Sequence, residues 1–228
     1  MLVTGAGRGV GLATVGALLE RPHVQVIAIS RNTAALDDLA RTQFGKRLVV
    51  GALDLLAPGA VDEVRALVGA RRLHGLIQNA GVLHNVAMGG HQRSALERLF
   101  ATNVWLPLEL AQALTNELKG DPPGHIVHIG SMGGFQDSAK FPGLIAYSAS
   151  KAALACVAQC LAEEFKELGI RSNCLALGAV DTDMLRAAFP GFQAPISAKE
   201  MGSYVAEFVL TGHKYFNGKV LPVATTTP

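Results

Sequence analysis

Seven short apolar runs alternate along the chain with longer segments of helical periodicity, and this alternation constrains the fold more than any other feature. Strands that alternate with helices pair in parallel through crossover connections. The predicted strands are the apolar runs at 2–4, 24–30, 47–55, 73–81, 125–131, 170–178 and 219–223. The predicted helices lie near 10–21, 33–44, 58–69, 94–118, 146–168 and 199–211. The sequence therefore predicts an α/β fold: a doubly wound, parallel, seven-stranded sheet with helices on both faces.

Length, composition and charge bear on the number of domains and on possible partners. The chain has 228 residues, 50% of them hydrophobic, so it can bury one large core. Its 20 basic and 18 acidic residues give a net charge of +2 and are scattered along the sequence. Nucleic-acid binding normally needs a clustered basic patch. The sequence therefore argues against nucleic acid as a partner.

Apolar runs and cysteines bear on the location of the protein. No apolar run approaches the roughly 18 residues of a membrane span, and the first residues lack the apolar core of a signal peptide. Cys156, Cys160 and Cys174 form an odd set, which is more typical of reduced, buried thiols than of a disulfide framework. Cys156 and Cys160 lie one helical turn apart and are expected to pack. We expect a cytoplasmic protein without a membrane segment.

Residues 4–11 read TGAGRGVG and follow directly on the first apolar run. The spacing of Gly5, Gly9 and Gly11 lets the backbone turn tightly and approach a pyrophosphate. Amides of the helix beyond Gly9 would face that anion. A plain strand-to-helix turn can carry the same glycines, so the pattern alone is weak. Its position between a predicted strand and a predicted helix favours phosphate binding.

Tyr147 and Lys151 stand four residues apart in YSASK, at the start of a predicted helix, so their side chains share one face. Ser131 ends the preceding predicted strand. A phenol with a pKa of about 10 is a poor acid-base catalyst unless positive charge stabilises its phenolate, and the Lys151 ammonium could do so. Ser131 could donate a hydrogen bond to a substrate oxygen while Tyr147 transfers the proton. The alternative is a chance Tyr–Lys pair on the surface.

The glycine loop and the YxxxK motif together resemble those of the short-chain dehydrogenase/reductases. Further matches follow in the family's order: Asp54-Leu55 at the end of the third apolar run, Asn79-Ala80-Gly81 at the end of the fourth, and Asn103 in the long helix. The resemblance runs from Leu2 to about Val223. It implies a single dinucleotide-binding Rossmann domain over residues 1–228, with a short substrate loop near 183–198.

The resemblance also implies the roles of individual residues. The implied catalytic set is Asn103, Ser131, Tyr147 and Lys151, in which Asn103 holds a water that leads from the lysine. The implied cofactor-binding residues, besides Tyr147 and Lys151, are Gly5, Arg8, Gly9, Val10, Gly11, Ser30, Arg31, Asp54, Leu55, Asn79, Ala80, Gly81, Gly178, Val180 and Thr182. The chemistry implied is hydride transfer between a nicotinamide and a carbonyl or alcohol.

The chain departs from the family pattern at four places. The first predicted strand is short, Gln78 replaces the usual first Asn before Asn79, and Leu177 stands where the family usually has Pro. The stretch from Ser131 to Tyr147 has about three residues more than usual for the family. We place this surplus in FQDSAKF, residues 135–141, and expect the segment to rim the substrate entrance.

The residues after the second predicted strand indicate the choice of cofactor. Folds that prefer NAD usually have an Asp or Glu there, which holds both ribose hydroxyls. Here Ser30 occupies that place and Arg31 follows, so a 2′-phosphate meets no carboxylate and finds a guanidinium. Arg8 could reach the same phosphate from the glycine loop. The alternative is that both arginines are merely solvated, but their joint placement predicts NADP(H).

We therefore predict an NADPH-dependent reductase of ketones or aldehydes, which could also run in reverse. The alternative is a cofactor-sensing regulatory or scaffolding protein of the same fold, which the Leu177 substitution and the short first strand would favour.

We expect no metal, because histidines 74, 84, 91, 125 and 128 lack ligand spacing. A homodimer or homotetramer is expected through the helices near 101–118 and 146–168. An apolar substrate pocket is suggested by Met184, Leu185, Phe189, Phe192 and Pro195.

Overall fold

The computed structural model describes residues 1–225, and in this part of the chain seven strands form one parallel sheet. The strands lie in the order β3-β2-β1-β4-β5-β6-β9, so the order reverses between β1 and β4. Their bounds are β1 Leu2–Thr4, β2 Val26–Ser30, β3 Leu48–Ala52, β4 Gly75–Gln78, β5 Gly124–Ser131, β6 Ile170–Leu177 and β9 Val220–Val223. A separate two-stranded sheet pairs β7, Val180–Asp181, with β8, Ile196–Ser197. The predicted seven-stranded parallel fold is confirmed.

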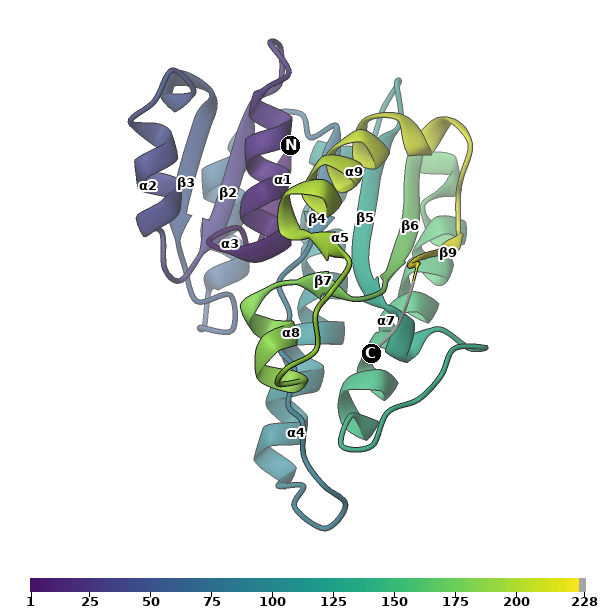
Figure 1. Cartoon of the computed structure of the whole chain (residues 1–228). Coiled ribbons are helices and arrows are strands. Elements are labelled where there is room, and N and C mark those ends of the chain that lie inside the picture. The colour runs from purple at the N-terminus through teal and green to yellow at the C-terminus, as the bar shows by residue number, and fades with distance from the viewer. Residues whose placement is uncertain (226–228) are drawn as a thin grey trace.

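Helices cover both faces of the large sheet. Their bounds are α1 Gly9–Leu19, α2 Ala34–Ala40, α3 Ala60–Val68, α4 Arg93–Phe100, α5 Leu106–Ala113, α6 Thr115–Leu118, α7 Ile145–Glu164, α8 Asp183–Ala188 and α9 Ala198–Thr211. Figure 1 shows α1 and α9 in front of the sheet, and α3, α5 and α7 behind it. The helices α4 and α8 lie beyond the carboxyl ends of the strands.

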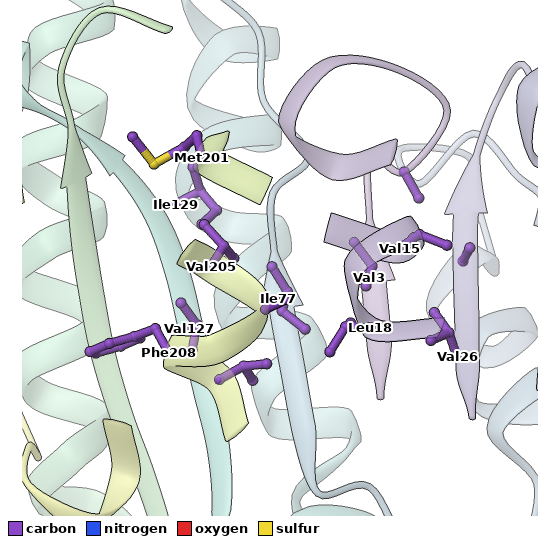
Figure 2. Close-up of a cluster of buried hydrophobic side chains, with 14 of the residues drawn as sticks. Val3, Val15, Leu18, Val26, Ile77, Val127, Ile129, Met201, Val205 and Phe208 are labelled. Atoms are coloured by element: carbon purple, nitrogen blue, oxygen red, sulfur yellow. The ribbon is translucent and has the colours of Figure 1, made fainter. Parts of the chain in front are cut away.

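Alternate residues of each strand supply two separate hydrophobic cores, as the period of two in a strand requires. Val3 and Ile77 belong to the cluster under α1 and α9, which Figure 2 shows, whereas their neighbours Leu2 and Leu76 belong to the opposite cluster. The opposite cluster contains Leu110 of α5 and Leu161 of α7. Because both faces are buried, the strands read as continuous apolar runs.

The segment predicted as one helix near 94–118 is broken in the structure. After α4 the chain forms a π-helical turn at Ala101–Trp105, followed by α5 and the short α6. Pro107, the second residue of α5, has no backbone N–H to donate to the carbonyl four residues earlier, that of Asn103. Such a missing bond is a common cause of a local change in helix geometry. The carbonyl of Pro107 instead accepts from Nε2 of the buried Gln78, at 2.7 Å.

Helix α7 corrects two expectations. Its 20 residues are long and apolar enough for a membrane span by length and composition, which the sequence analysis did not anticipate. In this fold, however, α7 packs against β5 and β6, with Leu154, Ala158 and Leu161 buried. The three cysteines are free thiols, but Cys156 and Cys160 are exposed on α7 rather than buried, and only Cys174 of β6 is buried. The spacing of Cys156 and Cys160 in the sequence shows that they share one face of the helix, but it does not show whether that face is buried or exposed.

Candidate active site

A pocket of about 710 Å³ runs along the carboxyl ends of the strands. Ligands of doubly wound sheets bind at this edge, near the point where the strand order reverses. Among the residues implied by the resemblance, those that line the pocket are Gly5, Arg8, Gly9, Val10, Ser30, Arg31, Asp54, Leu55, Asn79, Ala80, Gly81, Ser131, Tyr147, Lys151, Gly178, Val180 and Thr182. Gly11 and Asn103 do not line it. The pattern of motifs therefore converges on one pocket.

The glycine loop crosses very close to neighbouring backbone. A Cβ on Gly5, whose φ is +63°, would lie 2.8 Å from Cα of Ala80, and one on Gly7 would lie 2.3 Å from the carbonyl oxygen of Asn32. Only glycine fits either position. Gly7 also lines the pocket, although the sequence analysis did not single it out. Its role depends on the neighbouring β2–α2 connection, which the local pattern does not reveal.

Helix α1 begins at the pocket without a side-chain cap. Its N-cap is Arg8, which makes no capping hydrogen bond, and the first turn has no acidic residue. The unpaired amides and the positive end of the helix dipole favour an anion there. The cradle of glycine backbone and uncapped helix amides therefore fits a pyrophosphate.

Asn79 and Thr4 fasten the glycine loop to the sheet. Nδ2 of Asn79 donates to the carbonyl oxygens of Thr4 and Gly5, at 3.1 and 2.9 Å. Oγ1 of Thr4 accepts from the amides of Asn79 and Ala80, both at 3.1 Å. A Cβ on Gly11 would lie 2.4 Å from Nδ2 of Asn79, so Gly11 makes room for this amide. We infer that Gly11 acts on the glycine loop indirectly, by leaving space for the Asn79 amide that holds the loop in place.

Tyr147, Lys151 and Ser131 gather at the other end of the pocket. Tyr147 and Lys151 are buried, and Nζ of Lys151 lies 5.9 Å from the centroid of the Tyr147 ring. Nζ also donates to the carbonyl oxygen of Ile129 at 2.8 Å, which fixes the lysine beside the end of β5. Oγ of Ser131 accepts from the amide of Gly133 at 3.1 Å, so its own proton is free to be donated elsewhere.

Burial shifts the pKa of both titratable groups toward their neutral forms. It raises the pKa of the Tyr147 phenol, and a hydrogen bond with the Ser131 side chain acts in the opposite direction. It lowers the pKa of the Lys151 ammonium to about 8. The two shifts move the pKa of the phenol and the pKa of the amine apart, with the phenol now the weaker acid. The phenol therefore needs nearby positive charge to ionise near neutral pH.

Asn103 lies in the π-helical turn and is fully buried. Its Oδ1 accepts from the amide of Val82 at 2.9 Å, and its Nδ2 donates to the carbonyl of Val82 at 2.9 Å and to Oγ of Ser150 at 3.0 Å. Ser150 in turn donates to the carbonyl of Tyr147 at 2.7 Å. The side chain thus connects the loop after β4 with α7. These contacts indicate that Asn103 helps to position Tyr147 and does not contact a ligand directly.

The far end of the pocket is lined by Ser30, Arg31, Asp54 and Arg8. The two arginines are exposed, and neither forms a salt bridge within the described residues 1–225. Arg8 contributes to lowering the pKa of Asp183, behind the larger effect of Arg186, so its charge also reaches the start of α8. Both guanidinium groups border this end of the pocket, and their N–H groups could donate hydrogen bonds to a bound anion.

The segment 183–198 contributes less to the pocket than expected. Met184, Leu185 and Phe189 line it, together with Leu177 at the end of β6, whereas Phe192 and Pro195 do not. Phe141 lines it from the surplus segment 135–141. Several pocket residues were not anticipated from the sequence, among them Asn32, Leu83, Arg98, Thr102, Met132 and Leu144. Asn32, Leu83 and Leu144 lie in loops, where side-chain direction depends on contacts that are distant in sequence.

The histidines form no metal site. Among the described residues, no group of three or more His, Cys, Asp or Glu side chains could hold an ion. His125 and His128 of β5 are buried, and burial lowers their pKa values to about 4 and about 3. Nδ1 of His125 contacts the carbonyl of Val209 at 3.1 Å, and Nε2 of His128 contacts Oγ of Ser172 at 3.1 Å. Both rings are neutral parts of the core.

Comparison with known proteins identifies the family of the chain. The short chain dehydrogenase family model matches residues 1–191. L-xylulose reductase of Caenorhabditis elegans is 33% identical over 190 residues, which cover 82% of this chain and 73% of that protein. The 2,3-dihydro-2,3-dihydroxybenzoate dehydrogenase of Escherichia coli is 34% identical over 188 residues, 81% of this chain and 70% of that protein.

Solved structures give the same result. The NADP complex of Pseudomonas aeruginosa RhlG superposes with a TM-score of 0.82 at 26% identity, covering 97% of this chain and 93% of that one. The match therefore extends over the sheet, its helices and the pocket edge. The chain belongs to the short-chain dehydrogenase/reductase family of oxidoreductases.

Proposed function

We propose that this chain is an NADPH-dependent carbonyl reductase with a single dinucleotide-binding domain. The observation that carries the proposal is the placement of Tyr147 and Lys151 in the same pocket as the glycine loop and the two arginines. The net reaction converts a ketone or aldehyde, NADPH and one proton into an alcohol and NADP⁺, and the reverse reaction uses the same groups.

The residues of the pocket fit the cofactor along its whole length. The glycine loop and the uncapped start of α1 suit the pyrophosphate, and Arg8 and Arg31 suit a 2′-phosphate. Asp54 would accept from the adenine amine. Lys151 would contact the nicotinamide ribose. When bound, NADPH supplies the hydride that adds to the carbonyl carbon.

Protein groups would manage the charge and the proton. Ser131 donates a hydrogen bond to the substrate oxygen, and Tyr147 transfers its phenolic proton to the same oxygen. The Lys151 ammonium stabilises the resulting phenolate and lowers the effective pKa of the phenol. Asn103 acts through Val82 and Ser150, which hold the loop after β4 and the start of α7 in register.

The names of relatives support a redox reaction at a carbonyl or alcohol, because one is a reductase and another a dehydrogenase. Neighbouring solved structures hold either nucleotide, NADP in RhlG and NADH in 4-hydroxyisoleucine dehydrogenase, so the proposal of NADPH rests on Arg8 and Arg31. A purely regulatory protein would have no need to bury an amine beside a phenol at the pocket. We therefore favour the enzyme over the cofactor-sensing alternative.

The decisive experiment is Tyr147→Phe, which removes the proton donor and keeps the ring. We expect carbonyl-dependent NADPH oxidation to fall by about a hundredfold or more, in the range of general acid catalysis. NADPH affinity, measured by fluorescence titration, should stay within about twofold. Substantial turnover in the variant would remove Tyr147 from this role. If the unmodified protein binds NADPH but does not oxidise it in the presence of any carbonyl compound, the regulatory alternative is favoured.

A further inference from the structure

The end of the pocket next to Tyr147 has an apolar wall. Its residues include Leu83 after β4, Met132 after β5, Phe141 and Leu144 before α7, and Leu185 and Phe189 of the α8 region. None of these side chains has a charge or a hydrogen-bonding group. Tyr147 itself packs in a cluster with Leu144, Phe141 and Phe189.

Two aromatic rings from separate loops meet in this wall. Phe141 and Phe189 form an edge-to-face pair, with ring centroids 5.6 Å apart and an interplanar angle of 78°. Such a geometry is favourable and leaves ring surface available for a third aromatic group. The pair therefore defines a fixed shape rather than a loose apolar opening.

Asn85, an exposed residue in the loop after β4, fastens the two loops that carry these rings. Its Nδ2 donates to the carbonyl of Ala188 at 3.0 Å, one residue before Phe189. A Cβ on Gly143, whose φ is +81°, would lie 1.9 Å from Oδ1 of Asn85, so the loop that carries Phe141 passes directly against this side chain. The amide of the next residue, Val86, donates to the carbonyl of Gly143 at 2.9 Å.

Apart from Arg98, the charged side chains of the pocket lie away from this wall or already have partners, and Lys151 beside Tyr147 donates to the carbonyl of Ile129. Arg8, Arg31 and Asp54 follow β1, β2 and β3, at the other end of the sheet edge. Asp183 begins α8 and accepts from Nη2 of Arg186 at 2.7 Å. Arg98 lines the pocket from α4 and is the charged side chain that a carboxylate could reach. Its contribution is tested below.

We propose that the substrate is an uncharged carbonyl compound that carries an aryl or similarly bulky apolar group, and that Asn85 is the positioning residue for the wall that selects it. The proposal rests on the carbonyl reduction proposed above. Hydroxyls of a polyol would lose hydrogen bonds to water at this wall without replacement, and a carboxylate would lose its hydration. An aryl group gains burial against Phe141 and Phe189.

The first test measures binding and turnover for three probes: acetophenone, 4-acetylbenzoate, which is the same ketone with a carboxylate, and dihydroxyacetone. Calorimetric titration of the NADP⁺ complex should give a Kd for acetophenone at least about tenfold lower than for the other two, with kcat/KM in the same order. Equal or reversed preferences would overturn the proposal. Preference for 4-acetylbenzoate that Arg98→Met abolishes would assign the site to carboxylates instead. Tight acetophenone binding without any NADPH oxidation would leave the wall standing and refute the reductase function.

The second test changes the wall. Phe141→Ala and Phe189→Ala should each raise KM for acetophenone about tenfold and leave KM for butanone nearly unchanged. Phe192→Ala, in the same region but outside the pocket, is the matched control and should change neither. Asn85→Asp keeps the size but loses the donor to Ala188. It should raise KM for acetophenone while kcat with butanone and NADPH affinity stay constant, and a parallel fall in kcat for both substrates would reduce Asn85 to a merely structural role.

Discussion

Lys151 brings an ammonium group into the protein interior, where burial lowers its pKa to about 8. Its one hydrogen bond to protein is donated to the carbonyl of Ile129. A buried amine of this kind is a common feature of catalytic sites, and burying its charge lowers the stability of the fold. The lysine is therefore the residue at which proposed function and fold stability conflict most directly.

Replacing this amine should separate the two effects. We expect Lys151→Met to abolish most activity and to weaken NADPH binding by about tenfold, because a charge-assisted hydrogen bond to the ribose is lost. The cofactor-free variant should melt at the same temperature as the unmodified protein or higher at pH 7, since an apolar chain of similar length replaces the buried charge. Differential scanning fluorimetry with and without NADPH measures both. Unchanged NADPH affinity would contradict the ribose contact.

The same pair of proteins gives a pH test with a definite sign. The pKa of a lysine side chain is ordinarily 10.5 and is about 8 for Lys151 in the fold, so between these values the unfolded state binds more protons at this site. The stability that this group contributes to the unmodified protein therefore rises with pH through that window. The melting-temperature advantage of Lys151→Met should shrink between about pH 8 and pH 10. An advantage independent of pH would show that Lys151 is protonated normally in the fold.

Ser30, Arg31 and Arg8 form the basis of the cofactor prediction. Ser30→Asp combined with Arg31→Ile should reverse the preference from NADPH to NADH, because the carboxylate would hold the ribose hydroxyls and repel a 2′-phosphate. Losing a single arginine should weaken NADPH binding about ten- to a hundredfold. The ratio of kcat/KM for the two cofactors is the measurement. Equal efficiency with NADH and NADPH in the unmodified protein would refute the argument.

Helices α1 and α9 approach so closely that the contact admits only a glycine. A Cβ on Gly202 of α9 would lie 2.5 Å from Cβ of Ala13 and 2.6 Å from its carbonyl carbon, which belongs to the backbone of α1. The phosphate-facing start of α1 is thus braced from outside by α9. This contact joins residues almost 190 positions apart along the chain.

Adding one methyl group at this contact should lower the stability of the protein, whereas the same addition at a glycine with open space around it should raise it. Gly202→Ala should destabilise the protein by about 1–3 kcal/mol, because overpacking forces the two helices apart. Gly16→Ala, in α1 with no heavy atom within 4 Å of the added Cβ, should stabilise it by about 0.5–1 kcal/mol. Chemical denaturation of both variants is the test, and equal effects at the two glycines would contradict the close packing.

The sequence predicts elements well where local pattern decides them and poorly where distant contacts do. The apolar runs and the motifs at their ends were enough for the sheet and for Tyr147 and Lys151. The π-helical turn at Ala101–Trp105 was missed, although Pro107 was a visible signal for it. Gly7 and Asn85 owe their positions to loops that meet only in the folded chain. Periodicity cannot report such meetings.

On the scale of the whole molecule, two large apolar side chains are exposed on elements that pack against each other. Trp105, in the π-helical turn, and Ile145, at the start of α7, are each 52% exposed. The turn packs against α7, and α7 also presents Cys156 and Cys160 to the outside. Large apolar side chains that are exposed near each other commonly mark a contact between proteins. The expected homodimer or homotetramer would cover this face.

We expect light scattering at micromolar concentration to give a mass of at least two chains, because a second copy that packs α7 and Trp105 against its own would bury these side chains. Trp105→Glu should shift the protein toward the monomer, since the new carboxylate would lose its hydration at the contact. Met88→Glu, at a residue that is 80% exposed outside these helices, is the matched control and should leave the mass unchanged. Cys156 and Cys160 should react slowly with a thiol reagent in the assembly and quickly in Trp105→Glu, whereas buried Cys174 stays slow in both. A monomeric unmodified protein, or equally fast labelling of the two thiols in both proteins, would show that this face stays open to solvent.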